Sequence, residues 1–245
     1  MKKLLITLFA LLPSLVFAAG PSIPLDKANY DLTDKASLQN GAKLFINYCL
    51  GCHTMGYQRY ERVANDLDIP DDLMLDNLMF TDQKIGDLMT NSMHKKQASK
   101  WFGAAPPDLT LVARVRGADW LYTYLRSFYA DPRRPFGVNN TVFPDVGMPH
   151  VLEELQGVPN AVFETEMVDG VEHKTLVSIE ADGSGELSKD EYNQAVLDMV
   201  NFLVYSGEPM RVERERLGIF VLGFIFIFFI IAYLLKKEFW RDVHH

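Results

Sequence analysis

The only two cysteines of the 245-residue chain lie close together, in the segment Cys49-Leu50-Gly51-Cys52-His53. This is the C-x-x-C-H pattern of covalent haem attachment. Two thiols three residues apart on a helical turn can each reach one vinyl group of a haem, and the imidazole of the next residue then lies under the iron. The pattern therefore predicts one covalent haem c, held by Cys49 and Cys52, with His53 as an axial ligand of the iron.

Three other uses of a cysteine pair compete with haem attachment. A structural disulfide suits an oxidising compartment, and a thioredoxin-like redox pair has the same spacing. However, the flanking sequence lacks the βαβ pattern of a thioredoxin-like domain, and no fourth ligand stands at the spacing of a zinc site. Together with the export signal described below, the absence of any further cysteine favours haem attachment.

A haem that transfers electrons usually has a second protein ligand, and methionine is the ligand that raises the reduction potential. Of the ten methionines, Met148 is the predicted ligand, because Gly147 before it allows close backbone approach and Pro149 after it favours an extended loop. Met93 and His94 are the alternatives. The methionines in helix-like apolar patterns are expected in the core: Met74, Met79, Met89 and Met199.

The stretch 103–116 is expected to be a rigid loop that leads into a short helix. It contains Pro106 and Pro107 and ends in a run with two arginines. Arg114 and Arg116 are candidates to pair with haem propionates, because a guanidinium matches a carboxylate and a partly buried propionate needs a cation. The alternative is a pair of solvated arginines.

The elements predicted to position these residues are mainly helical. Apolar residues at helical spacing over 35–48 lead into the attachment motif, and Gly41 allows another helix to cross closely. The crossing helix is predicted to begin at Ser188, because Glu191 three residues later completes a capping-box pattern. A third helix is expected over 120–128, where aromatic residues could line the haem or simply form core.

A change of pattern between 161 and 179 predicts a β-hairpin inserted into the helical domain. β-Branched and apolar residues there are interrupted by Asp169-Gly170, a strong hairpin signal. The following stretch, 182–191, superficially resembles a calcium-binding loop. Its twelfth position is Asn193 instead of the required glutamate, so a surface turn and helix cap is expected.

Both ends of the chain contain apolar segments. Residues 1–18 show the charged, apolar and small-residue order of a secretory signal peptide. Residues 217–235 are uncharged and would cover about 28 Å as a helix, which matches a bilayer core. The predicted organisation is a cleaved signal, an exported domain over 19–210, a transmembrane anchor over 217–235 and a cytoplasmic tail over 236–245. An uncleaved N-terminal anchor and a buried soluble helix are the respective alternatives.

The chain is acidic, with a formal net charge of −8 that becomes −10 when Lys2 and Lys3 leave with the signal. This charge argues against a nucleic-acid partner and is compatible with a basic protein partner. One acidic cluster could steer such a partner, or could simply be a solvated face. Its members are Asp66, Asp68, Asp71, Asp72 and Asp76.

Four motifs in this order resemble the cytochrome c1 family, the haem subunit of the cytochrome bc1 complex. They are Cys49–His53, the Ala-Pro-Pro-Asp-Leu segment 105–109 with its two following arginines, the segment 143–149 and the segment 207–218 before the final apolar run. The resemblance implies a mainly α fold: a c-type cytochrome domain with a small β-hairpin insertion and one C-terminal transmembrane helix.

The resemblance also implies roles for individual residues. His53 and Met148 would be the axial pair, Arg116 would lie at a propionate, and Pro106 and Pro107 would line the exposed haem edge. The sequence departs from many members at position 120, where a tryptophan stands in place of a tyrosine.

The function implied by the resemblance is electron transfer from the Rieske iron-sulfur protein to a c-type cytochrome, with no bond-making chemistry in this subunit. The complex would include cytochrome b, lie in the inner membrane with the haem domain on the periplasmic side, and be dimeric. The alternatives are a tethered monohaem cytochrome of a terminal oxidase or nitric oxide reductase, an exported haem peroxidase, or a non-haem interaction module tethered to the membrane.

Overall fold

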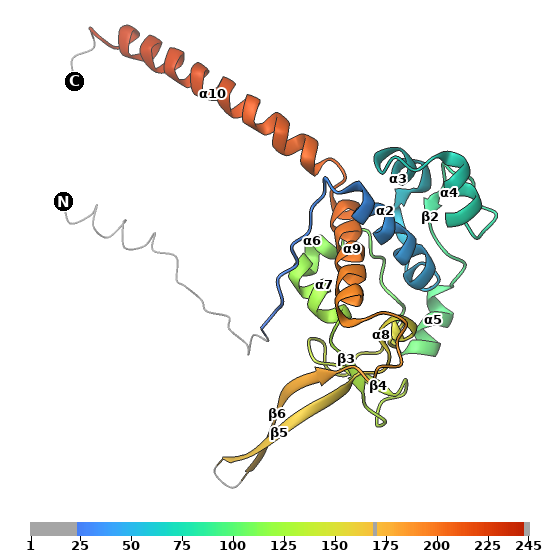
Figure 1. Cartoon of the computed structure of the whole chain (residues 1–245). Coiled ribbons are helices and arrows are strands. Elements are labelled where there is room, and N and C mark those ends of the chain that lie inside the picture. The colour runs from blue at the N-terminus through green and yellow to red at the C-terminus, as the bar shows by residue number, and fades with distance from the viewer. Residues whose placement is uncertain (1–23, 169–170, 243–245) are drawn as a thin grey trace.

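The computed structural model describes residues 24–168 and 171–242. In these residues a helical body carries short antiparallel strand pairs, and one long C-terminal helix extends away from it (Figure 1). The predicted mainly helical fold with one hairpin and one C-terminal apolar helix is confirmed. The predicted signal peptide, residues 1–18, lies outside the described residues.

The elements before the hairpin follow one another along the chain in this order: α2 (Lys35–Leu44), η1 (Phe45–Cys49), β1 (Met55–Arg59), α3 (Tyr60–Asp66), α4 (Asp71–Leu78), β2 (Leu88–Met89), α5 (Lys95–Phe102), α6 (Val112–Arg116), α7 (Ala118–Leu125), β3 (Phe128–Ala130), β4 (Val138–Asn140) and α8 (Glu153–Gln156). The hairpin strands β5 (Asn160–Val168) and β6 (Val171–Glu180) and the helices α9 (Lys189–Gly207) and α10 (Arg211–Phe239) complete the fold.

Helix α2 brings the attachment motif into the interior. It begins where the Asp34 side chain accepts a hydrogen bond from the backbone N of Ser37 at 3.0 Å. Leu38 and Ala42 are buried on its inner side. The helix then widens into the π-helical turn η1, a feature that is common at functional sites. This turn ends at Cys49, so the predicted helix over 35–48 is confirmed with a wider last turn.

Helix α9 packs directly against α2, and Gly41 makes this possible (Figure 1). A Cβ atom at Gly41 would lie 2.0 Å from the carbonyl oxygen of Asp198, so any larger residue would push the helices apart.

The predicted start of α9 is also confirmed. Ser188 and Glu191 form both hydrogen bonds of the capping box.

A buried carboxylate joins the same two helices. Asp198 on α9 accepts hydrogen bonds from Ser37 Oγ and from Asn40 Nδ2 on α2, both at 2.7 Å. Gln194 Nε2, one turn earlier on α9, donates to the same carboxylate at 2.8 Å. Because these donors satisfy the buried charge, the polar contact holds the helices in one register.

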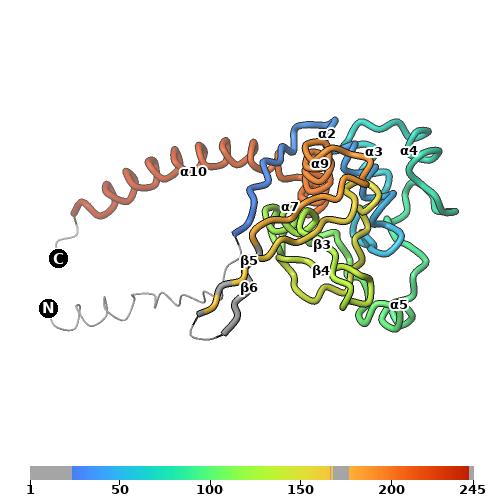
Figure 2. The backbone as a smooth tube through the Cα atoms, turned by 60° about the horizontal axis from the view of Figure 1, so that its bottom comes forward, coloured from blue at the N-terminus to red at the C-terminus, as the bar shows by residue number. Residues whose placement is uncertain are grey.

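A lobe beside α2 contains α3, α4 and the strand pair β1–β2 (Figures 1 and 2). Met74 and Met89 are fully buried in the core and Met79 nearly so, as expected. The expectation that they belong to helices was wrong for two of them, since Met79 follows the end of α4 and Met89 lies in β2. A short apolar run has no period that separates a brief strand from a helix.

Helix α7 ends at Leu125, earlier than the predicted helix over 120–128. The carbonyl oxygen of Tyr124 accepts a hydrogen bond from Asn140 Nδ2 at 2.8 Å, and the Ser127 hydroxyl donates to the carbonyl of Thr123. These side chains occupy the carbonyls at the helix end, and Phe128 begins strand β3, which pairs with β4.

The predicted hairpin is confirmed as the antiparallel pair β5–β6, which projects from the body in the ribbon and in the backbone tube (Figures 1 and 2). Its turn residues, 169 and 170, lie outside the described residues. At its base the ring of Phe163 lies 6.0 Å from that of Tyr129 on β3.

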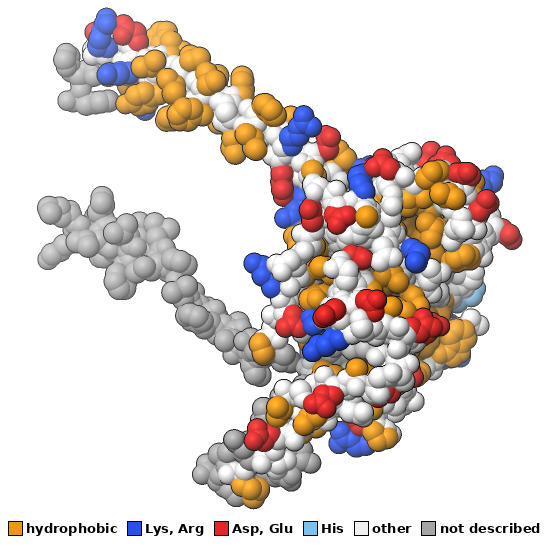
Figure 3. Space-filling model, viewed as in Figure 1, with side chains coloured by type: hydrophobic (Ala, Val, Ile, Leu, Met, Phe, Trp, Pro, Cys, Tyr) orange, Lys and Arg blue, Asp and Glu red, His pale blue; other side chains and the backbone are white. Residues whose placement is uncertain are grey.

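Helix α10 is long and apolar enough to cross a membrane, because an 18-residue stretch of it has a mean hydropathy of 2.9 and is not buried against the body. It contains the predicted anchor, 217–235, and its surface is hydrophobic along most of its length (Figure 3). At its start, Arg214 Nε lies 2.5 Å from the carboxylate of Glu208, and Arg211 Nη1 donates to Tyr30 Oη at 2.9 Å. These contacts tie the first turn of the helix to the body.

Candidate haem-binding site

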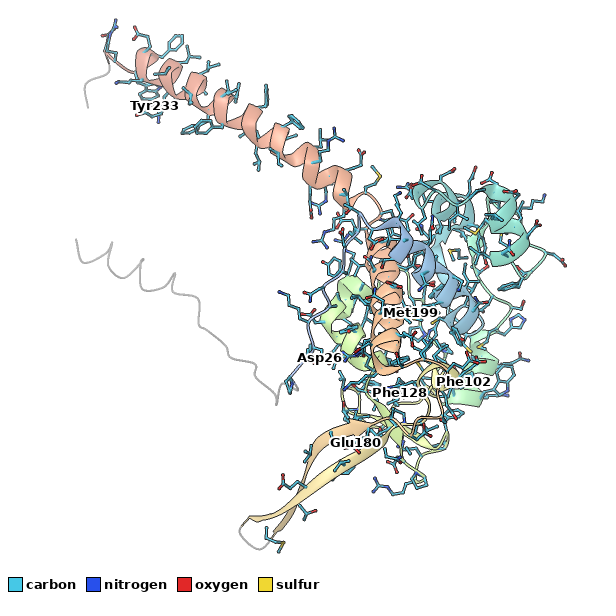
Figure 4. All side chains as sticks on the ribbon, viewed as in Figure 1. Asp26, Phe102, Phe128, Glu180, Met199 and Tyr233 are labelled. Carbon is cyan, nitrogen blue, oxygen red and sulfur yellow. The ribbon has the colours of Figure 1, made fainter. Side chains whose placement is uncertain are left out.

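A cavity of about 370 Å³ lies in the body, within the size range of small-molecule and cofactor sites. Its walls come from η1 and the loop after it, from the loop before α6, from α7, from the loop before α8 and from α9. Met199 on α9 and Phe102 at the end of α5 both line it (Figure 4). The cavity also brings together the predicted residues Cys49, Cys52, His53, Pro106, Pro107, Arg116 and Met148.

Both cysteines are free thiols at this cavity, Cys49 buried and Cys52 half-buried. The turn that presents them is tight, because the backbone N atoms of Cys52 and His53 both donate to the carbonyl oxygen of Cys49, at 3.1 and 2.8 Å. Burial, with a smaller contribution from Cys52, raises the pKa of the Cys49 thiol to about 12. The thiol is therefore neutral at pH 7.

The His53 imidazole is oriented by the loop before α6. Its Nδ1 atom lies 2.7 Å from the carbonyl oxygen of Pro107. A carbonyl can only accept, so Nδ1 carries the proton and Nε2 keeps its lone pair. Burial lowers the pKa of His53, against smaller opposing effects of Pro107 and Asp108. A neutral imidazole with one nitrogen fixed in this way is the usual form of a metal-ligating histidine.

Asp108 holds the Pro107 loop in place. Its carboxylate accepts hydrogen bonds from Thr54 Oγ1 at 2.7 Å, from the backbone N of Gly56 at 2.6 Å and from the backbone N of Thr110 at 2.9 Å. Burial would raise the pKa of Asp108, but these hydrogen bonds outweigh it and the pKa is lowered. The charged carboxylate therefore joins the segment after His53 to the loop that orients it.

Met148 lies on a loop that many side chains hold in place. Asn140 Oδ1 accepts from the backbone N of Val142 at 2.9 Å, and Asn139 Oδ1 accepts from the backbone N of Asp145, also at 2.9 Å. Arg134 donates to the Asp145 carboxylate at 2.8 Å. The loop between β4 and α8 thus presents the methionine rigidly to the cavity.

The prediction that Gly147 allows close backbone approach is confirmed. A Cβ atom there would lie 3.2 Å from the carbonyl oxygen of Phe102. The loop therefore passes directly over the end of α5, which places the neighbouring Met148 at the cavity wall.

The alternative ligands lie elsewhere. Met93 and His94 do not line the cavity, and His94 is the exposed residue that precedes α5. Met199 does line it, but its Sδ lies 3.8 Å from Cys49 Sγ. If Cys49 bonds the edge of a porphyrin, as predicted, a sulfur beside it would lie at that edge and not at the iron.

The two candidate arginines differ in position. Arg116 lines the cavity, and its guanidinium carbon lies 4.8 Å from the ring centre of Trp120 and 5.8 Å from that of Phe143. No ion pair joins Arg116 to a carboxylate among the described residues. Arg114 points instead to Glu208, with a nitrogen–oxygen distance of 3.6 Å, and does not line the cavity. The structure thus brings only Arg116 to the site.

The acidic cluster on α3, on α4 and in the loop between them lies outside the cavity walls. Asp66 accepts hydrogen bonds from Arg62 and from the Tyr205 hydroxyl, and Asp68 lies 3.4 Å from Lys35. Part of this cluster therefore has local structural partners.

Sequence reasoning named Tyr124 only as an aromatic residue that could line the haem. It missed the residues that hold the ligand loops, namely Arg134, Asn139, Asn140 and Asp108 as the carboxylate that clamps the loop. A run of Asn, Asp and Pro around 139–145 is a general loop signal, but it does not show which backbone atoms the side chains bind.

These residues fit a covalently bound haem. Two thiols, an imidazole whose Nε2 keeps its lone pair and a thioether on a rigid loop converge on one apolar cavity, and the Arg116 guanidinium, which has no ion-pair partner among the described residues, stands at its wall. The donor set would supply two attachment points and two axial ligands to such a group, and the guanidinium would supply a counter-charge for a carboxylate.

Comparison with known proteins points in the same direction. The sequence model described as "Cytochrome C1 family" matches residues 27–243. The chain is 53% identical to a cytochrome c1 of Allochromatium vinosum over the full length of both chains. It is 46% identical to a protein of Nitrosomonas europaea named "Ammonia monooxygenase gamma subunit", over 100% of this chain and 99% of the other. A cytochrome c1 of Blastochloris viridis is 26% identical over 86% of this chain and 82% of its own length.

Proposed function

Since this chain belongs to the cytochrome c1 family, we propose that Cys49 and Cys52 attach its haem and that His53 and Met148 are the axial ligands. The family carries one covalent haem c, and the chain is the electron-transfer subunit of a cytochrome bc1 complex, anchored by a C-terminal helix. The observation that carries the residue assignment is the convergence of these four side chains on one apolar cavity.

The haem supplies a one-electron redox couple. The chain would provide both axial ligands, surround the haem with apolar walls and hold His53 through Pro107. With two protein ligands no position would remain open for a small substrate, which favours electron transfer over a peroxidase. The same reasoning argues against oxidation of ammonia at this haem, the reaction that the name of the Nitrosomonas relative suggests. Arg116 is the proposed partner of a haem propionate, and Pro106 and Pro107 form the proposed exposed edge.

A bc1 complex implies cytochrome b and a Rieske iron-sulfur protein as companion subunits. We propose further that the Rieske protein is the electron donor, that a c-type cytochrome is the acceptor and that the complex is dimeric. The exposed carboxylates of Asp71, Asp72 and Asp76 could raise the rate of encounter with a basic acceptor at low salt.

The proposed topology follows from the two apolar ends. Residues 1–18 are the cleaved signal, 19–210 form the haem domain on the periplasmic side of the inner membrane, 217–235 cross the bilayer in contact with lipid and 236–245 remain cytoplasmic. The apolar surface of α10 and its position outside the body support this arrangement.

The test uses the purified full-length chain in mild detergent. Haem should remain on the polypeptide in a denaturing gel, and the reduced spectrum should not change with carbon monoxide. The Met148→Leu variant should keep its haem, have a lower reduction potential and bind carbon monoxide, because the thioether is gone. Met93→Leu is the matched control and should behave like the unmodified chain.

Two results would contradict the proposal. A purified polypeptide without bound haem would contradict the proposed haem attachment and every role that depends on it. An unchanged potential in Met148→Leu, together with no carbon monoxide binding, would move the second ligand to Met93 or His94.

A further inference from the structure

One wall of the cavity is a column of three side chains spaced four residues apart. The Arg116 guanidinium lies over the Trp120 ring at 4.8 Å, and the Trp120 ring stacks on Tyr124 with centres 4.8 Å apart and planes 10° apart. Tyr124 completes the column by donating its hydroxyl to Met148 Sδ at 3.3 Å. The column therefore reaches from the guanidinium at the cavity wall to the proposed axial sulfur.

The Tyr124 hydroxyl is held in this position. The side chain is only 9% exposed. Trp120 covers one face of the ring, and Phe128 packs edge-on with centres 5.3 Å apart. The backbone of the same residue is fixed as well, because its carbonyl oxygen accepts from Asn140 Nδ2 at 2.8 Å. The ring therefore cannot turn its hydroxyl away from Met148 without disturbing two packed aromatic contacts.

The hydrogen bond from Tyr124 is compatible with Met148 acting as a metal ligand. A thioether sulfur is a weak hydrogen-bond acceptor with two lone pairs, so it can bind a metal with one and accept an O–H with the other. The phenol of Tyr124 supplies the O–H donor that such a sulfur can accept. No other acceptor of this hydroxyl lies within hydrogen-bond distance among the described residues.

We propose that Tyr124 is a positioning residue that orients the Met148 sulfur and raises the reduction potential through this hydrogen bond. The inference rests on the proposed function, in which Met148 is the second axial ligand. A hydrogen bond to the sulfur withdraws electron density from it and makes it a poorer donor. The oxidised metal needs that density more than the reduced metal does, so the bond favours the reduced state. Hydrogen bonds to ligand sulfur are among the known determinants of such potentials.

The experiment is a redox titration of the haem-loaded full-length chain and of its Tyr124→Phe variant. Phenylalanine keeps the stacked and edge-on ring contacts and removes only the hydroxyl. We expect the equilibrium between reduced and oxidised protein to shift about threefold toward the oxidised state, which is about 30 mV at 59 mV per tenfold change. The absorption band that reports the bond between thioether and oxidised iron should persist but change in position or intensity.

Tyr192→Phe is the matched control. Tyr192 is buried like Tyr124, but its hydroxyl donates to the carbonyl oxygen of Leu125 at 2.7 Å and not to a sulfur. This variant should lose stability without any change in potential. An equal shift in both variants would show a nonspecific effect of losing a buried hydroxyl and would overturn the inference.

The remaining outcomes separate the inference from the function on which it rests. If Tyr124→Phe leaves the potential and the thioether band unchanged, the role of Tyr124 is wrong while Met148 remains the ligand. If the unmodified chain shows no thioether band, and Met148→Leu has an unchanged potential, the ligand assignment itself fails and the inference fails with it.

Discussion

The imidazole of His53 and the carbonyl oxygen of Pro107, 54 residues further along the chain, lie 2.7 Å apart. This contact determines which nitrogen of the histidine faces the cavity. The Pro107 loop is itself tied to the segment after His53 by the carboxylate of Asp108. The orientation of the proposed axial ligand therefore depends on a second segment of the chain and on one carboxylate within it.

Asp108→Ala should loosen this arrangement. It removes hydrogen bonds from Thr54, Gly56 and Thr110, and because the carboxylate is partly exposed we expect the free energy of unfolding to fall by about 1–2 kcal/mol. The potential of the haem-loaded chain should also become heterogeneous. Denaturant unfolding and redox titration measure the two effects. Asp72→Asn on α4 is the control, because Asp72 is exposed and has no side-chain partner in the part of the chain that the structure describes. Equal effects in both variants would contradict the role of Asp108.

Acid should weaken the support of the Met148 loop, because Asp131 accepts a hydrogen bond from Asn139, the residue that holds this loop. Hydrogen bonds from Arg133 lower the pKa of Asp131 to about 2, despite the opposing effect of burial, and Asn139 adds a smaller contribution. A depressed carboxyl pKa stabilises the fold above the ordinary value of 3.8, and this contribution is lost as the pH falls from about 4 to about 2.

Denaturant unfolding of the unmodified chain and of Asp131→Asn, at pH 6 and at values down to about 2, checks the effect of Asp131. The variant should be less stable at pH 6 and should lose less stability on acidification. If both chains lose the same free energy of unfolding on acidification, Asp131 does not contribute to the loss of stability in acid.

Gly41→Ala should strain the contact between α2 and α9. The added Cβ would lie 2.0 Å from the carbonyl oxygen of Asp198, so the helices must separate. The cost should exceed the small gain in helix propensity and lower the free energy of unfolding by at least about 2 kcal/mol. Ala36→Ser, on the exposed side of the same helix, should change it by less than about 0.5 kcal/mol. A Gly41→Ala chain as stable as this control would show that the helices adapt.

Cys49→Ser should largely prevent maturation, because only one thioether could then form. A haem stain of a denaturing gel measures the fraction of chain that carries haem. Met199→Leu is the control, since its Sδ lies 3.8 Å from Cys49 Sγ and the change nearly conserves volume. Normal haem loading of the Cys49→Ser chain would mean that this cysteine is not an attachment point.

Several elements could be predicted from local sequence, because their signals depend on neighbours within a few residues. The capping box at Ser188 and Glu191 and the hairpin around 169–170 are such cases. The end of α7 could not be predicted, because Asn140, which binds the carbonyl of Tyr124, comes from a strand 16 residues away.

By itself, the sequence determined that two thiols and an imidazole share one turn, that an uncharged run of 19 residues lies near the C-terminus and that a glycine stands in the helical pattern before the cysteines. The tertiary structure decided which carbonyl orients His53, which arginine reaches the cavity and which hydroxyl meets Met148. The physical reason is the separation along the chain of the residues that make each contact. Covalent spacing fixes the contacts within a turn, whereas a contact between distant residues exists only after packing has brought their elements together.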